Sequence, residues 1–335
     1  MAATRADVAR AAGVSPALVS YVLNGGPRPV SAAARERILQ AVEELKYRPN
    51  KIAQSLRGSR THSIAMLMPD HLNPHFAELA QAVENESFAN DYMLMIGTTD
   101  NDLTRELSYL HSFMDRQVDG LLLISATAHP DVTSITEAGI PVVLLDRAPP
   151  GSLFSTVVID NRQGAFAAVQ HLLGHGRKSP VCISGPPDIE AIIQREAGWS
   201  DALTASGHSA PLPWRTSLSR QGGYAAMRAI LAADVQPDSL FTVSDVQAFG
   251  AIRACVEAGQ AVPRDISVVA FDGTEAGLFT QPRLTSVDQA VGSIARTAID
   301  TLLGQIRNQD TSPVHHVLRP ELRLGESCGC QTQRQ

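Results

Sequence analysis

Polar side chains that can bind a ligand follow several apolar, strand-like segments of this chain. They are Asp70 with Asn73, Asp146, Asp160 with Asn161, Asp245 and Asp272. Ligands of open parallel sheets bind beyond the carboxyl ends of the strands, so these side chains are candidates for one shared pocket. Carboxylates accept hydrogen bonds, and side-chain amides accept and donate them. Such a residue can instead form a turn or cap the next helix, and this alternative stays open for Asn73, Asp160 and Asn161.

Catalytic residues and a phosphate loop are not predicted. No strand-to-helix elbow built on Gly-x-Ser-x-Gly is expected, and Ser, His and Asp are scattered without the order of a triad. The segment 176–179, GRKS, resembles the end of a phosphate loop, but the upstream glycine and the Gly-Lys pair are missing. We therefore expect a protein that is not an enzyme.

The four cysteines predict no metal site. Cys182 and Cys255 lie in apolar segments and are expected to be core thiols, while Cys328 and Cys330 form a C-x-C pair near the C-terminus. A zinc site needs a second pair of ligands, and none stands nearby in the sequence. No cofactor and no metal are expected, and so few cysteines favour a reduced, cytoplasmic protein.

These candidate ligands must be positioned by alternating strands and helices. From His62 onward, short apolar runs alternate with helical stretches near 75–90, 102–117 and 130–138 in a first set. A second set continues from 157 to 271, and a helix from Gln289 to about Asn308 precedes a strand near 314–318. Continuous apolar strands separated by amphipathic helices favour parallel sheets covered on both faces. The pattern predicts two doubly wound subdomains.

The N-terminal residues predict a different, all-helical unit. Thr4 with Asp7 fits a helix start, Gly13 permits a tight turn, and Ser15 followed by Pro16 fits a second start. The second helix is expected to end at Asn24-Gly25. Two short helices about a glycine turn form a helix-turn-helix, which lays its second helix in the major groove of DNA. An ordinary helical hairpin is the alternative at this point.

The next segments add a third helix and a basic linker. A helix is expected from Ser31 to about Lys46, and a short one over 51–57, which is too short to hold alone in water. Residues 1–61 hold ten Lys or Arg and four Asp or Glu, a net charge of +6; the remainder holds 18 and 30, a net charge of −12. This asymmetry indicates a basic head for a polyanion and an acidic body with another task.

Several long motifs resemble the lactose-repressor family of bacterial transcription regulators. In the head these are DVARAAGVS, VSYVLNG and VEELKYRPNKIAQSLR; in the body they are NPHFAEL, VDGLLL, GIPVVLLDR, VVIDN, ISGPP, VPRDISVVAFD and the closing GES. The resemblance covers essentially the whole chain. It implies a homodimer with two helix-turn-helix heads, hinge helices that fold on double-stranded operator DNA, and a periplasmic-binding-protein-like body that senses a small molecule.

The resemblance also implies DNA-contacting positions. On the head and hinge these are Thr4, Ser15, Pro16, Ala17, Leu18, Ser20, Tyr21, Asn24, Asn50, Ala53 and Leu56. Tyr21 stands where an arginine is frequent, and tyrosine cannot make the bidentate contact to guanine, so the operator sequence is expected to differ. Leu56 takes the position of a leucine that levers open a base step in the minor groove, with the small Ala53 one turn earlier. The alternative for Leu56 is a residue of an apolar linker.

In the body, the resemblance implies a set of effector contacts. They are Asp70, Asn73, Asp146, Arg195, Asp245, Asp272 and Gln289. Arg195 matches the arginine that the family uses on ligand hydroxyls or carboxylates. Carboxylates that accept and a guanidinium that donates in pairs suit the vicinal hydroxyls of a sugar.

The predicted organisation is a head over 1–48, a hinge over 49–61 and a two-lobed body over 62–330. The first lobe takes about 62–160 and 289–318, and the second about 161–288 and 319–330. We expect a DNA-binding regulator, acting as a repressor and controlled by a sugar or sugar derivative between the lobes, with no membrane association. The alternatives are a sugar-binding transport or chemoreceptor protein, disfavoured by the basic head and the lack of a signal peptide, and a sugar-metabolising enzyme.

Overall fold

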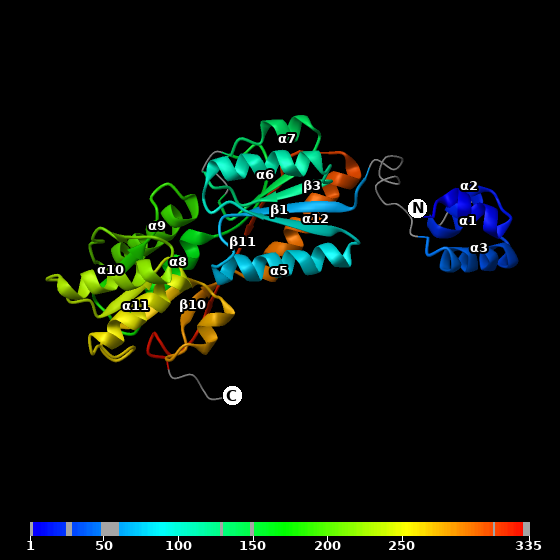
Figure 1. Ribbon diagram of the computed structural model, residues 1–335. Helices are drawn as coiled ribbons and strands as arrows, with labels where there is room; N and C mark the ends of the chain where they lie inside the picture. Colours follow the sequence, from blue (N-terminus) through cyan, green and yellow to red (C-terminus); the bar gives the residue numbers. More distant parts are fainter. Residues whose placement is uncertain are drawn as a thin grey trace. The chain divides into compact units, whose positions relative to one another are not determined.

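The computed structural model describes residues 3–24, 29–47, 60–127, 130–147, 151–310 and 312–330. The chain forms two compact units, Met1–Thr61 and His62–Gln335. Figure 1 shows the first unit as three helices and the second as two α/β lobes. No helix of the described residues combines the length and the apolar character needed to cross a bilayer.

The first unit contains α1 (Arg5–Ala12), α2 (Pro16–Asn24) and α3 (Ala32–Glu44). Thr4 and Asp7 form the predicted capping box: the Asp7 amide donates to Thr4 Oγ1 over 3.3 Å, and the Thr4 amide to Asp7 Oδ2 over 2.9 Å. Gly13 ends α1 with φ +65°, the left-handed conformation that glycine adopts freely. Apolar side chains from all three helices then meet in one core: Val8, Ala9, Ala12, Val19, Val22, Ile38 and Ala41.

The first lobe of the second unit is built on a six-stranded parallel sheet in the order β11-β5-β4-β3-β1-β2. The strands are β1 (Ser63–Met68), β2 (Met93–Thr98), β3 (Gly120–Leu123), β4 (Val142–Leu145), β5 (Ser155–Ile159) and β11 (His315–Leu318). Helices α5 (Pro74–Ala89) and α12 (Val291–Asn308) cover one face, and α6 (Leu103–Asp115) and α7 (Thr133–Glu137) the other (Figure 1). Alternate β1 residues enter the two cores, Ile64 and Met66 on one side, Ala65 and Leu67 on the other.

The second lobe repeats this plan with the order β12-β10-β9-β8-β6-β7, where only β12 is antiparallel to its neighbour. The strands are β6 (Pro180–Ser184), β7 (Trp214–Arg215), β8 (Ser239–Thr242), β9 (Ser267–Asp272), β10 (Thr285–Asp288) and β12 (Glu321–Arg323). The helices are α8 (Asn161–Gly174), α9 (Glu190–Ala205), α10 (Arg220–Ala232), α11 (Asp245–Glu257) and the 3-10 helix η1 (Glu275–Phe279). Residues of α8 and α9 share one core with the sheet, and residues of α10 and α11 share the other.

The two parallel sheets confirm the predicted fold class. The expected body helices and strands lie within a few residues of their predicted positions, but α10, β7, β10 and β12 were not anticipated. Helix α10 begins RQGG, and its two glycines weaken the helical pattern of the sequence. Glycine is needed at the second of these positions, because a Cβ at Gly223 would lie 2.0 Å from the Gln247 carbonyl oxygen. The chain passes between the lobes three times, after β5, after β10 and after β11.

Candidate functional site

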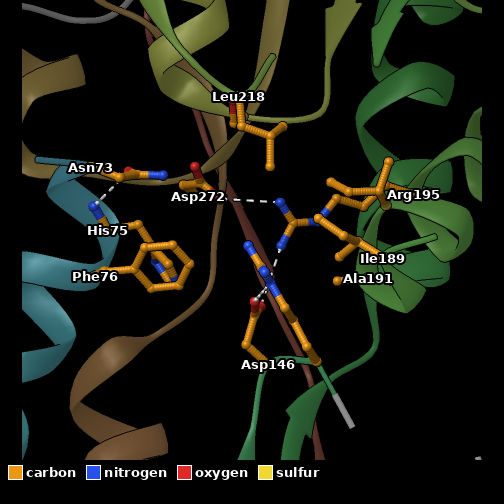
Figure 2. A pocket seen from close by; sticks show the side chains of 12 residues that line it. Asn73, His75, Phe76, Asp146, Ile189, Ala191, Arg195, Leu218 and Asp272 are labelled. Carbon is orange, nitrogen blue, oxygen red and sulfur yellow. Dashed lines mark hydrogen bonds and ion pairs between the residues drawn. The ribbon is translucent and has the colours of Figure 1, made fainter. Parts of the chain in front are cut away.

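A small cavity, about 30 Å³ in volume, lies where loops from both lobes meet. The first lobe contributes the loops after β1 and β4 and the start of α5, and the second the loops after β6, β7 and β8, the end of β9 and α9 (Figure 2). The lining residues are Asn73, His75, Phe76, Asp146, Arg147, Ile189, Ala191, Ile192, Arg195, Leu218, Ser244 and Asp272. The volume lies well below the roughly 300–1,000 Å³ of small-molecule pockets, so a ligand of sugar size requires the lobes to separate.

Arg195 is the central side chain of this cavity. It is buried in α9, and its Nη1 donates to Asp272 Oδ1 over 3.1 Å and to the Val243 carbonyl oxygen over 2.7 Å. Its Nε donates to Asn161 Oδ1 over 2.8 Å, and its guanidinium lies 3.8 Å from the centre of the Phe271 ring. These contacts hold the planar group in one orientation, as bidentate recognition of a ligand requires.

Two carboxylates face Arg195 from opposite lobes. Asp272 follows β9 of the second lobe, and Asp146 follows β4 of the first lobe, with Oδ1 3.9 Å from Arg195 Nη2 (Figure 2). Both aspartates have positive φ, +119° for Asp272 and +57° for Asp146. Non-glycine residues adopt such angles at a cost of order 1–3 kcal/mol, and strain of this kind clusters at ligand sites. Because Arg195 belongs to the second lobe and Asp146 to the first, their ion pair links the two lobes directly across the cavity.

Asp272 is held by a buried polar network. Gln289 Nε2 donates to Asp272 Oδ1 over 2.8 Å, and the Asp245 amide to Asp272 Oδ2 over 3.4 Å. The Asp245 carboxylate accepts from the Thr274 amide and hydroxyl, both over 2.7 Å, and from Ser286 Oγ over 2.5 Å. Asp245 and Gln289 thus position Asp272 instead of lining the cavity themselves.

The two buried carboxyls hold their protons unusually tightly. Burial and then the charge of Asp272 raise the pKa of Asp245 to about 7, against the hydrogen bonds from Ser286 and Thr274, which lower it. Burial also raises the pKa of Asp272 to about 6, although Arg195 opposes this rise. Desolvation, which disfavours the charged form, therefore outweighs the nearby guanidinium.

We predict that this network makes the stability of the body depend on pH. Because both carboxyls bind a proton more tightly in the folded chain than at the ordinary pKa of 3.8, their stabilising contribution is complete below about pH 3.8 and is lost as the pH rises through about 6 to 7. Denaturant unfolding of wild type should show a free energy that falls across this window. Asp245→Asn should flatten the fall, and an unchanged slope in that variant would contradict the prediction.

The structure brings four of the seven predicted effector residues to the cavity: Asn73, Asp146, Arg195 and Asp272. Asp245 and Gln289 lie one contact behind, and Asp70 lies away from it, where its Oδ1 accepts from the Leu72 amide over 2.7 Å in a turn. Asp160 caps α8 by accepting from the Gln163 amide, whereas its neighbour Asn161 holds Arg195. Asn73 caps α5, as its alternative interpretation expected, and it also lines the cavity, where its contact with an effector stays a prediction.

Besides Ser244, which precedes the predicted Asp245, two polar lining residues were not predicted from the sequence, His75 and Arg147. His75 is buried, its Nδ1 has no hydrogen-bond partner among the described residues, and burial lowers its pKa, which keeps the imidazole neutral. Arg147 donates through Nη1 to Asn101 Oδ1 over 2.7 Å, while its buried Nε has no hydrogen-bond partner within the described ranges. His75 stands two positions after the predicted Asn73, and Arg147 directly after the predicted Asp146. This proximity in the sequence was the signal that could have identified them. Both add hydrogen-bonding atoms for a polar ligand.

In the head, the predicted DNA-contacting residues cluster at the start of α2. Pro16 and Ala17 are exposed, Leu18, Ser20 and Tyr21 are half-buried, and Ser15 Oγ accepts from the Leu18 amide over 3.3 Å. Thr4 caps α1. The side chain of Asn24 and the hinge residues Asn50, Ala53 and Leu56, with the short helix expected over 51–57, lie outside the described residues.

Known proteins and family models match this chain over most of its length. The family model for bacterial regulatory proteins of the lacI family matches residues 4–50, and that for periplasmic binding protein-like domains matches residues 169–328. The HTH-type transcriptional repressor PurR of Erwinia tasmaniensis is 34% identical over 92% of this chain and 91% of its own. The ribose operon repressor of Escherichia coli K12 is 34% identical over 91% of this chain and 93% of its own.

Solved structures agree with these matches. The Lac repressor dimer bound to operator and the anti-inducer ONPF superposes with a TM-score of 0.88 at 25% identity, covering 98% of this chain and 99% of that one. The complex of the transcriptional regulator CelR with cellobiose has a TM-score of 0.73 at 30% identity, covering 97% and 99%.

Proposed function

The chain belongs to the lacI family of bacterial regulatory proteins, and from this we propose that it is a transcriptional repressor that binds operator DNA as a homodimer and responds to a sugar or sugar derivative. The observation that carries the sugar assignment is the Asp146–Arg195–Asp272 array, which offers acceptors and a forked donor from two lobes to one cavity. Vicinal hydroxyls accept and donate hydrogen bonds in that arrangement.

The apolar side of the cavity supports the same ligand class. Phe76, Ile189 and Leu218 face the polar array (Figure 2). A sugar ring presents hydroxyls around its rim and C–H groups on its faces, so it fits a cavity that has both kinds of surface. The ribose operon repressor and the CelR–cellobiose complex carry a sugar in their name or title, and a sugar is the class that this polar array favours.

Control of DNA binding follows from the contact between the lobes. A ligand that enters between Asp146 and Arg195 competes with their 3.9 Å ion pair, and it also changes the environment of the Glu275 amide, which donates to Glu78 Oε1 of the first lobe over 2.9 Å. The free-energy difference between the closed and the separated arrangement of the two lobes therefore changes when the ligand binds. Residues 49–61 lead from the body to the head, and a change in their spacing on the two protomers couples ligand binding to DNA binding.

We further propose that the protein has no enzymatic activity and acts in the cytoplasm, where its operator lies. The segment 325–329, GESCG, has the letters of a nucleophile elbow, but Ser327 is buried, donates to the Val268 carbonyl oxygen and accepts from the Thr285 amide. In the cavity, Ser244 donates to Gln247 Oε1, and no described histidine lies within hydrogen-bond reach of it. No nucleophile there is paired with a base.

The proposed function is tested by binding of the purified protein to the DNA upstream of its own gene, across a salt series and with a panel of sugars. We expect specific binding with a steep salt slope, as phosphate contacts require, and a change in affinity caused by one sugar. The direction of that change identifies inducer or corepressor. Sugar binding without preference for any DNA would contradict the proposal and favour a transport or chemoreceptor protein.

Leu56→Ala tests the predicted minor-groove wedge in the same DNA-binding assay. If Leu56 levers open a base step, its truncation should weaken specific operator binding by about 1–3 kcal/mol, roughly 5- to 150-fold, because the bent DNA loses its wedge. Sugar affinity should stay at the wild-type value, since the variant leaves the body unchanged. Wild-type operator affinity in Leu56→Ala would refute the wedge.

A further inference from the structure

Four cysteine and histidine side chains meet at the C-terminal end of α8. His171 and His175 are one helical turn apart, and Cys328 and Cys330 come from the segment after β12. One ligand atom from each of the four side chains lies within 4.8 Å of the other three. Cys328 and Cys330 were not expected to bind a metal because no second pair of ligands stands nearby in the sequence; the fold supplies that pair from more than 150 residues away.

Three of the six distances within this cluster match the edges of a tetrahedral metal site, and the Cys328 ligand atom lies within 4.8 Å of the other three. With Zn–N near 2.0–2.1 Å and Zn–S near 2.3 Å, a tetrahedron has N···N edges of about 3.3 Å and S···N edges of about 3.5 Å. Here the two histidine Nε2 atoms lie 3.3 Å apart, and Cys330 Sγ lies 3.5 Å from His171 Nε2 and 3.3 Å from His175 Nε2. A single ion at the centre would therefore reach these atoms with little rearrangement.

Hydrogen-bond donors around Cys328 suit a metal ligand as well. Thr285 Oγ1 lies 3.0 Å and the Cys330 amide 3.4 Å from Cys328 Sγ, contacts that stabilise a thiolate.

We propose that His171, His175, Cys328 and Cys330 bind one Zn²⁺ ion. Four protein ligands complete a tetrahedron and leave no open position, which is typical of a structural site and not of a catalytic one. Two thiolates with two imidazoles in tetrahedral geometry favour zinc over oxygen-seeking cations. The ion ties the segment after β12 to α8, so it fastens the C-terminal segment to the second lobe.

The test measures metal in the full chain, made without a histidine tag and kept reduced. After dialysis in metal-free buffer, wild type should retain one Zn²⁺ per chain by elemental mass spectrometry. His175 is exposed and Cys330 half-buried, so His175→Ala and Cys330→Ser should fold. Both should lose zinc affinity by more than the roughly 10–100-fold that loss of an outer-shell partner costs. His111→Ala, an exposed histidine of α6, should keep the ion.

Cobalt substitution provides an independent readout of geometry. Co²⁺ bound to wild type should give the intense visible bands of tetrahedral coordination and a thiolate-to-cobalt charge-transfer band, and Cys330→Ser should weaken that band. A chelator should lower the melting temperature of wild type but not of Cys330→Ser, because metal that binds only the folded state stabilises it. Any of three results would overturn the proposal: a zinc content of wild type no higher than that of the variants, an octahedral cobalt spectrum, or a Cys328–Cys330 disulfide in protein purified under reducing conditions.

Discussion

Arg195→Ala is expected to abolish the response to effector while DNA binding persists. Truncating one partner of a buried, hydrogen-bonded charge pair costs 2–5 kcal/mol or more in binding, which corresponds to a roughly 30- to 5,000-fold weaker affinity. Arg195 makes the ion pairs with Asp272 and Asp146 and also holds Asn161, so its removal takes away the donor fork and disorders the acceptors around it. Operator affinity without effector should change by less than about threefold.

Two further variants separate the chemistry of the guanidinium from its charge. Arg195→Lys keeps a positive charge beside Asp272 but loses the planar fork, so effector affinity should fall between those of wild type and Arg195→Ala. Arg253→Ala removes an exposed arginine of α11 that pairs with Glu257, and it should leave both affinities unchanged. Isothermal titration with the effector and gel-shift titration with the operator measure the two affinities. Wild-type effector affinity in Arg195→Ala would place the effector elsewhere.

Gly198→Ala is expected to damage stability and effector binding together. Gly198 lies in α9 one turn after Arg195, and a Cβ there would stand 2.1 Å from the Arg162 carbonyl oxygen and 2.9 Å from Ala165 Cβ of α8. The two helices must move apart to admit the methyl group, and overpacking of this kind costs about 1–3 kcal/mol. Because α8 presents Asn161 to Arg195, the same movement stretches the 2.8 Å hydrogen bond that orients the guanidinium.

Gly304→Ala is the matched control for this substitution. Gly304 lies inside α12, and a Cβ there would meet no atom within 4 Å. Since glycine in a helix interior costs about 0.5–1 kcal/mol relative to alanine, the control should raise the free energy of unfolding by up to that amount. Denaturant unfolding and effector titration of both variants give the comparison. Equal stability of the two variants would mean that α8 and α9 relax without cost.

The helices of the head and most of the strands along the chain were predictable because their signals are local. The capping pair Thr4 and Asp7, the turn at Gly13 and the Ser15-Pro16 start each act within one helical turn. The rule that ligands bind beyond the carboxyl ends of parallel strands requires only the positions of those strand ends. It correctly predicted that Asp146 and Asp272 line one cavity. Such features depend on neighbours in the chain and on a general property of the sheet.

Side-chain direction and distant partners were not predictable. Asp70, Asp245 and Asp272 all follow strands, yet one forms a turn, one supports another carboxylate and one lines the cavity, and the difference depends on packing. The cysteine and histidine cluster joins residues that no local pattern connects. Arg147 was missed because the prediction stopped at the preceding aspartate.

The three passages between the lobes have a consequence for the protein during its synthesis. When the ribosome has released β5, which ends at Ile159, the first sheet still lacks β11 and the helix α12 that covers one of its faces. About 130 residues of the second lobe are translated before α12 begins at Val291, which takes roughly 6 to 26 s at 5–20 residues per second. Throughout that interval the surface awaiting Ile299 and Leu302 is uncovered on the nascent chain. The lobe that is begun first is therefore completed only near the end of the chain, at β11, just before β12 completes the second lobe.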